Sequence, residues 1–254
     1  MKLLVSQMPY FGWSVENVFS LPRDLGIEIF IEFGNRYYYD EVIEKVMKGR
    51  RGSLSIHGPF TMMNLASKYC DFEAVMQTYR IAFDYCARYH ALHCVCHPHA
   101  EWPEYEGFLL EDGQKLVVER VLKLDEEAKR MGVQMLVENM PYRKLIFDQK
   151  DFTEILGAQK ELKFLIDTGH AILNGWRIDE VQKALQGRIY GYHIHENKGD
   201  FDAHLQIVTG LYDWKKFFEN YKKYTPDAAI VMEYAQWNAA EIARNVEHIE
   251  ELML

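Results

Sequence analysis

The sequence has little of what marks secreted, membrane-spanning or nucleic-acid-coating proteins. Only four of its 254 residues are cysteine, and the opening segment MKLLVSQMPYF shows no basic region followed by a long apolar stretch. We therefore expect no secretory signal and reduced thiols. No apolar run approaches the ~18 residues that cross a membrane. The formal net charge of -9 argues against a protein that coats nucleic acid by charge alone. These absences favour a cytoplasmic protein without a membrane partner.

Linkers, low-complexity tracts and a glycine-rich phosphate loop are also lacking. The segment after the first apolar run reads PYFGWS, without the glycine fingerprint of a dinucleotide-binding sheet. Instead, short apolar runs recur along the chain, and each is typical of a strand buried on both faces of a parallel sheet. These predicted strands are residues 2–8, 27–33, 53–58, 92–97, 133–139, 162–168, 189–195 and 228–234.

Segments with apolar residues at three- and four-residue spacing lie between these runs, as expected of amphipathic helices. The predicted helices are 14–24, made irregular by Pro22, then 40–49, 71–90, 111–132 with a stop at Gly132, 150–157, 178–187, 213–223 and 238–252. Strands and helices alternating over about 250 residues match the size of a (β/α)8 barrel. We predict an α/β fold with one TIM-barrel domain over residues 1–254, and an open doubly wound sheet is the alternative.

Ionisable side chains gather at the carboxyl ends of the predicted strands. They are Glu32, His57, His97, His99, Glu138, Asp167, His170, His193, His195, Asp202, His204 and Glu233. In a barrel these ends converge on one mouth, where so many carboxylates would repel one another unless protonated or bound to cations. Mixed histidine and carboxylate donors suit zinc, manganese, iron or cobalt. The pattern predicts a divalent metal centre.

Two local patterns bear on which residues would bind such an ion. Cys94 and Cys96, just before His97, are either thiolate ligands or small residues of a buried strand. Asp202 and His204 are two residues apart, so they would face the same side and chelate one ion if the chain there is extended.

Six segments carry a resemblance to a known family. SIHGPF, HPH, VENMP, IDTGHA, HIHENKGDFDAHL and VMEY follow one another at the ends of predicted strands three to eight. In this order they resemble the xylose-isomerase-like TIM barrels, which include the sugar-phosphate isomerase/epimerase family and endonuclease IV. The resemblance covers nearly the whole chain.

The resemblance implies nine metal ligands in three groups. The central group is Glu138, Asp167, His193 and Glu233. By similarity to the three-zinc endonuclease IV, a second group adds His57 and His97 to a shared Glu138, and a third group is His170, Asp202 and His204. The implied cofactor is Zn²⁺ or Mn²⁺, with one to three ions.

The same resemblance implies two chemistries. The first is a metal-dependent sugar or sugar-phosphate isomerase or epimerase, or a related polyol dehydratase. In it Glu138 and Glu233 transfer a proton alpha to a carbonyl through a metal-stabilised enediolate, while His170 holds a substrate oxygen. The second is an abasic-site phosphodiesterase with a di- or trinuclear zinc cluster. We prefer a small sugar partner over nucleic acid because the chain is acidic and shows no clear basic rim.

Substrate contacts are expected from side chains near the same mouth. Glu196 and Lys198 follow His193 where epimerases often carry Glu and Arg, although lysine lacks the bidentate fork of arginine. Aromatic residues of the predicted loops either form an apolar wall for a sugar or pack the loops onto the barrel. The expected substrate contacts are Trp13, Phe60, His99, Trp102, Trp176, His195, Glu196 and Lys198. The sequence leaves the sugar, the metal and the oligomeric state open.

Overall fold

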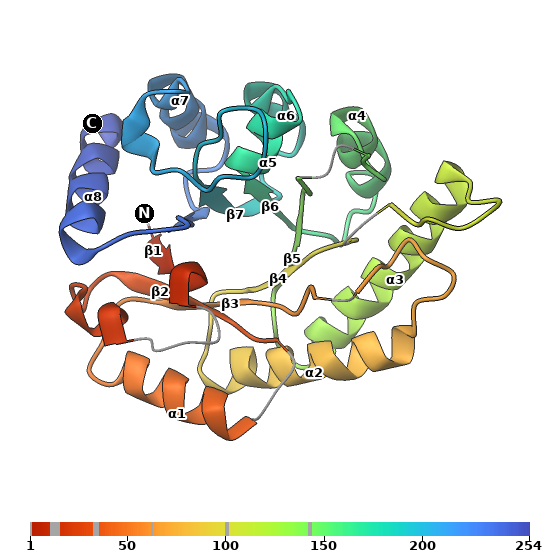
Figure 1. Ribbon diagram of the computed structural model, residues 1–254, viewed down its shortest axis with the longest axis horizontal. Helices are drawn as coiled ribbons and strands as arrows, with labels where there is room; N and C mark the ends of the chain where they lie inside the picture. The colour runs from red at the N-terminus through yellow and green to blue at the C-terminus, as the bar shows by residue number, and fades with distance from the viewer. Residues whose placement is uncertain (1, 11–15, 33–35, 62, 100–101, 142–143) are drawn as a thin grey trace.

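The strands of the protein close into one parallel barrel. The computed structural model describes residues 2–10, 16–32, 36–61, 63–99, 102–141 and 144–254. Neighbouring strands pair in chain order, and the last strand pairs with the first (Figure 1). The strands are β1 Lys2–Ser6, β2 Gly26–Phe30, β3 Leu54–His57, β4 Cys94–Cys96, β5 Met135–Glu138, β6 Phe164–Asp167, β7 Ile189–Ile194 and β8 Ala229–Met232. The predicted (β/α)8 barrel is confirmed, and each predicted run overlaps one strand.

Helices lie around the outside of the barrel (Figure 1). They are α1 Arg36–Met47, α2 Phe72–Arg88, α3 Leu110–Arg130, α4 Gln149–Asp151, α5 Thr168–Leu173, α6 Ile178–Ala184, α7 Trp214–Tyr224 and α8 Ala239–Met253. The 3-10 turns are η1 Met8–Tyr10, η2 Glu16–Ser20 and η4 Ile207–Thr209, and η3 Phe152–Leu156 is a π-helical turn after α4. In the part of the chain that the structure describes, no helix is long and apolar enough to cross a membrane.

The structure differs from two of the predicted helices, confirms the end of a third and adds a short one. Within 14–24 the described residues form only η2, in keeping with Pro22 at the end of that segment. The predicted helix 150–157 is split between α4 and η3. The stop at Gly132 is confirmed, because α3 ends at Arg130 and Gly132 has a φ of 73°. The short helix α5 was not predicted, since it follows β6 without a connecting loop.

Part of the barrel interior below the mouth is apolar. Successive strand residues face opposite sides of a sheet, so Leu136 lies two residues below Glu138, and Leu165 two residues below Asp167. Leu136, Leu165 and Val95 form a fully buried cluster. The donors that end β5 and β6 therefore lie above apolar residues, and a much larger apolar cluster fills the space between strands and helices.

A candidate metal centre at the mouth of the barrel

The ends of β5 to β8 bring four donors together. Glu138 ends β5, Asp167 ends β6 in register with His193 of β7, and Glu233 directly follows β8. Their ligand atoms lie within 4.8 Å of one another, and all four residues are buried. Nδ1 of His193 is 3.1 Å from Oε1 of Glu138, 3.6 Å from Oδ2 of Asp167 and 3.3 Å from Oε2 of Glu233. Three buried carboxylates and one imidazole form a donor set that suits a divalent ion.

A second group of donors shares Glu138 with this central group. His57 at the end of β3 and His97 just after β4 both direct Nε2 toward Oε2 of Glu138, at 3.8 and 2.8 Å. The three residues again lie within 4.8 Å by their ligand atoms. Glu138 is therefore placed to bridge two cation positions.

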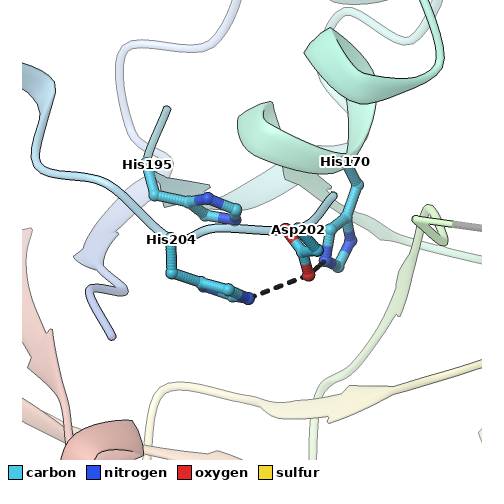
Figure 2. Close-up of side chains that lie close together, drawn as sticks. All are labelled: His170, His195, Asp202 and His204. Carbon is cyan, nitrogen blue, oxygen red and sulfur yellow. Dashed lines mark hydrogen bonds and ion pairs between the residues drawn. The ribbon is translucent and has the colours of Figure 1, made fainter. Parts of the chain in front are cut away.

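A third group contains His170, Asp202 and His204, whose side chains point toward one another (Figure 2). Oδ2 of Asp202 is 3.1 Å from Nε2 of His170 and 2.9 Å from Nε2 of His204. The chain is not extended there, because His204 has a φ of 45°. The two side chains thus meet through a left-handed backbone turn, a conformation that costs energy for a non-glycine residue and is found at functional sites.

In three of these histidines a hydrogen bond at Nδ1 fixes the ring, and Nε2 points toward the other donors. Nδ1 faces a backbone carbonyl in each case, namely Gly58 for His57 at 2.9 Å, Asn139 for His170 at 2.8 Å and Glu233 for His204 at 3.0 Å. An Nδ1–H that donates to a carbonyl leaves the Nε2 lone pair free, which is the usual arrangement of a metal-binding histidine. The residues therefore fit divalent cations.

His193 is held in the reverse orientation. Its Nδ1 faces the carboxylates, and its Nε2 lies 2.9 Å from Oε1 of Glu28. Glu28 is a fully buried residue of β2. A carboxylate behind a ligating imidazole fixes its orientation and increases its basicity.

Burial and mutual charge set the protonation of the cluster. Burial raises the pKa of Glu233 to about 7. At Glu138 burial acts in the same direction, but His193 and His97 outweigh it and hold its pKa well below the usual range. Burial opposes a charge on His170, yet Asp167 and Asp202 raise its pKa to about 10. Protonated histidines thus offset the negative charge of the carboxylates, and a divalent ion would displace these protons when it binds.

A cavity of about 180 Å³ opens over the donors. It is lined by Met8, Phe30, His57, Phe60, His97, Glu138, Met140, Pro141, His170, Asp202, His204 and Glu233. Among these described lining residues there is no lysine or arginine. Five of these residues are apolar and seven are histidine or carboxylate residues, so apolar side chains and converging polar groups share one small cavity, as in small-molecule sites.

Residues 24–252 match the family model of the xylose isomerase-like TIM barrels. The chain belongs to this family. Among solved structures it resembles a D-tagatose 3-epimerase-like protein, with a TM-score of 0.81, 22% identity, and coverage of 100% of this chain and 97% of that one. It also resembles an AP endonuclease, family 2, from Brucella melitensis, with a TM-score of 0.75, 13% identity, and coverage of 98% and 99%. At these identities the likeness establishes the fold.

A curated relative is the uncharacterized protein MJ1614 of Methanocaldococcus jannaschii. It is 28% identical over 176 residues, and the match covers 66% of this chain and 66% of that protein. The chain thus spans just under two thirds of the length of this relative.

The predicted substrate contacts of this xylose isomerase-like barrel occupy several different environments. Phe60 lines the cavity, and its backbone N–H donates to Glu32 at 2.8 Å. His99 is buried, but it is not among the lining residues. Trp102 packs on Phe108 with ring centroids 4.9 Å apart, and Trp13 lies outside the described residues.

Three further predicted contacts are not among the residues that line the cavity. Trp176 is buried against Phe152, with ring centroids 5.5 Å apart, in the apolar core outside the barrel. The Glu196 carboxylate is engaged within its own loop, where Trp214 and others donate to it. Lys198 is exposed to solvent. For these three residues the geometry favours packing, loop anchoring and solvation over substrate contact.

The two strand cysteines are small buried residues. Cys94 and Cys96 are fully buried in β4, and burial raises the pKa of Cys96 to about 12. Neither belongs to a donor group among the described residues. The buried-strand alternative is thereby favoured over thiolate ligation.

The sequence did not lead us to Glu28, which contacts His193, or to most of the apolar residues that line the cavity. Glu28 stands in the middle of the apolar run IEIFIEF, and an acid at a buried strand position was a usable signal. Met8, Met140 and Pro141 offered no comparable signal, because apolar residues near strand ends are common in any barrel.

Proposed function

We propose that this protein is a divalent-metal-dependent isomerase or epimerase of a sugar or sugar phosphate. The lining of the cavity carries the proposal. Glu138 and Glu233 share a compact pocket with apolar side chains such as Phe60, and the described lining residues include no lysine or arginine. Such a pocket suits a small polar molecule better than the polyanionic backbone of DNA.

In the proposed reaction, two glutamates of the cavity move a proton. Glu138 reaches the cavity from the end of β5 and Glu233 from the end of β8, with β6 and β7 between them. One carboxylate would remove a proton from the carbon next to a carbonyl, and the other would return it. His170, which also lines the cavity, would hold a substrate oxygen. Zn²⁺ or Mn²⁺ held by the central group would supply positive charge against the oxygens that become negative.

One observation favours a second candidate function. The groups around His97 and around His204 flank the central group, so the donors suffice for two or three ions. Clustered ions clamp the attacking and leaving oxygens of phosphate esters in many hydrolases. Hydrolysis of an abasic-site phosphodiester is therefore the alternative reaction, and its partner would be DNA.

A direct comparison of the two reactions tests the proposal. The metal-loaded protein is incubated with ketoses and ketose phosphates in D₂O, and deuterium uptake is followed by NMR. We expect uptake that falls about 10²- to 10⁴-fold in Glu233→Gln, the usual effect of losing a general acid or base. The matched control is Glu119→Gln, an exposed residue of α3, which should behave as the wild type.

The same preparations are tested on a duplex with one abasic site. Nicking that disappears in Glu233→Gln, with no deuterium uptake by the wild type, would replace the isomerase with the phosphodiesterase. Deuterium uptake that survives Glu233→Gln would contradict the assigned proton-transfer pair.

A further inference from the structure

His195 lies beside the donors of the third group, and its role decides the nature of an ion bound there. Its ligand atom is within 4.8 Å of those of His170, Asp202 and His204. Its ring is buried and stacks on His204, with centroids 3.9 Å apart and an interplanar angle of 14° (Figure 2). An ion with four protein ligands is closed and structural, whereas an ion with three keeps a position for water or substrate.

The two ring nitrogens of His195 are arranged unlike those of its neighbours. Nε2 is 2.9 Å from Oδ1 and 3.0 Å from Oδ2 of Asp167, so an Nε2–H donates to this carboxylate. Nδ1 is buried and has no hydrogen-bond partner among the described residues. His170 and His204 instead place Nδ1 on a backbone carbonyl and keep Nε2 free.

Neither ring nitrogen of His195 suits a ligand role. Binding an ion through Nε2 would break the hydrogen bond to Asp167 and move the proton to Nδ1, where a buried N–H would have no described acceptor, and such a group is costly. Binding through Nδ1 would keep that hydrogen bond, but a Cβ at residue 169 would come within 2.1 Å of this nitrogen, so Gly169 already packs against the ring there. The cavity also argues against a ligand role for His195, because His170, Asp202 and His204 line it and His195 does not.

Gly169 supplies the space that this arrangement needs. A Cβ at residue 169 would lie 1.9 Å from Cε1 and 2.1 Å from Nδ1 of His195. The Asn197 side chain donates to the Gly169 carbonyl at 2.7 Å, and the Thr168 hydroxyl bonds both the N–H and the carbonyl of His195, at 3.1 and 3.0 Å. The ring is thus locked between Asp167 and His204.

We propose that His195 is a positioning residue of the metal centre and not one of its ligands. Its Nε2–H orients Asp167 for the central ion, and its ring supports the His204 imidazole. An ion bound by the third group would then be held by His170, Asp202 and His204 alone, and these three residues line the cavity. This inference rests on the metal centre of the proposed function, although not on the reaction catalysed there.

Ion counting and affinity measurements on the full chain test the role. Zn²⁺ is titrated in competition with a chromogenic chelator, and bound ions are counted by mass spectrometry. Asp167→Asn and Asp202→Asn identify the titration steps of the central and third groups. We expect His195→Leu to weaken the central step about 10- to 100-fold while all ions still bind at saturation. His195→Gln retains an N–H donor and should recover most of the affinity.

Gly169→Ala offers an independent variant that touches no donor atom. Its Cβ would displace the His195 ring, so it should weaken the central step as His195→Leu does. If His195→Leu does not fold, as judged by circular dichroism, His195→Gln and Gly169→Ala carry the test.

Two results would overturn the proposal. In one, His195→Leu and His195→Gln both lose the same ion that Asp202→Asn loses, because His195 would then be a ligand. The other is unchanged affinity in both His195→Leu and Gly169→Ala. A wild-type chain that binds ions in the expected steps but takes up no deuterium would overturn only the proposed reaction, because the role of His195 is decided by its variants.

Discussion

At the scale of single residues, Glu28 carries a buried charge inside the barrel that neighbouring side chains stabilise. Its Oε1 faces His193, its Oε2 accepts from the Ser55 hydroxyl at 2.9 Å, and His93 lies 3.7 Å from the same oxygen. Burial opposes the charge of Glu28, but His193 outweighs it and lowers the pKa of the carboxyl group. The carboxylate thereby keeps the His193 ring turned with Nδ1 toward the donor cluster.

Replacing Glu28 with glutamine tests this support. The amide keeps the size of the side chain but removes the negative charge that increases the basicity of His193. We expect Zn²⁺ affinity of the central group to fall about 10- to 100-fold, measured by chelator competition. Wild-type affinity in Glu28→Gln, with Glu119→Gln as the surface control, would show that His193 needs no such partner.

The residue scale also marks the limit of prediction from sequence. The donors could be named because parallel strands of a barrel end at one mouth, so position along the chain implied proximity. The directions of Trp176 and Glu196 could not be named, because they depend on how loops and helices pack. Trp176 turns to Phe152 in the outer core, and Glu196 turns back into its own loop.

At the scale of elements, the segment between β7 and α7 is organised by Glu196. Its backbone pairs with Leu205 through two hydrogen bonds of 2.8 and 2.9 Å. Its carboxylate accepts from the Thr209 hydroxyl, the Trp214 indole and the backbone N–H of Tyr212. One residue thus closes the loop that carries Asp202 and His204.

Removing this carboxylate should loosen the loop. In Glu196→Ala the buried indole N–H of Trp214 loses its acceptor, which costs about 1–3 kcal/mol, and the less buried donors of Thr209 and Tyr212 lose their link to the strand end. We expect weaker ion binding by the third group and faster proteolytic cleavage within 198–211, followed by mass spectrometry. Glu196→Gln keeps one acceptor oxygen and should lie between. Wild-type cleavage in Glu196→Ala would mean that the loop is held by other contacts.

The elements themselves were mostly predictable, and the exception has a physical cause. Near-continuous apolar runs identified every strand, because both faces of each are buried. Helix α5 was not predicted because it is too short to show the helical spacing of apolar residues. Asp167 ends β6 and also caps this helix, since its Oδ1 accepts from the His170 N–H at 2.7 Å.

At the scale of the whole molecule, ion binding and folding are linked. The donors come from β3 to β8 and approach one another only in the closed barrel. Glu138, Asp167 and Glu233 are buried close together, so an ion that neutralises them binds the folded chain far more tightly than the unfolded one.

Metal removal should therefore lower the melting temperature. An ion at 100 times its Kd stabilises the fold by about 2.7 kcal/mol, which corresponds to roughly 5–10 °C for a chain of this size. Thermal unfolding with EDTA and with added Zn²⁺ measures the difference, and Asp167→Asn should show a smaller one. Equal melting temperatures of the wild type under both conditions would contradict a folded-state metal centre.

The pairing of β8 with β1 also orders events on the ribosome. Glu233, directly after β8, is the last of the donors to be synthesised. A nascent chain still missing this strand has neither a closed barrel nor a complete central group. An ion at the central group therefore binds only after the last strand has been made and has joined the barrel. It retains only those chains whose first and last strands have already met.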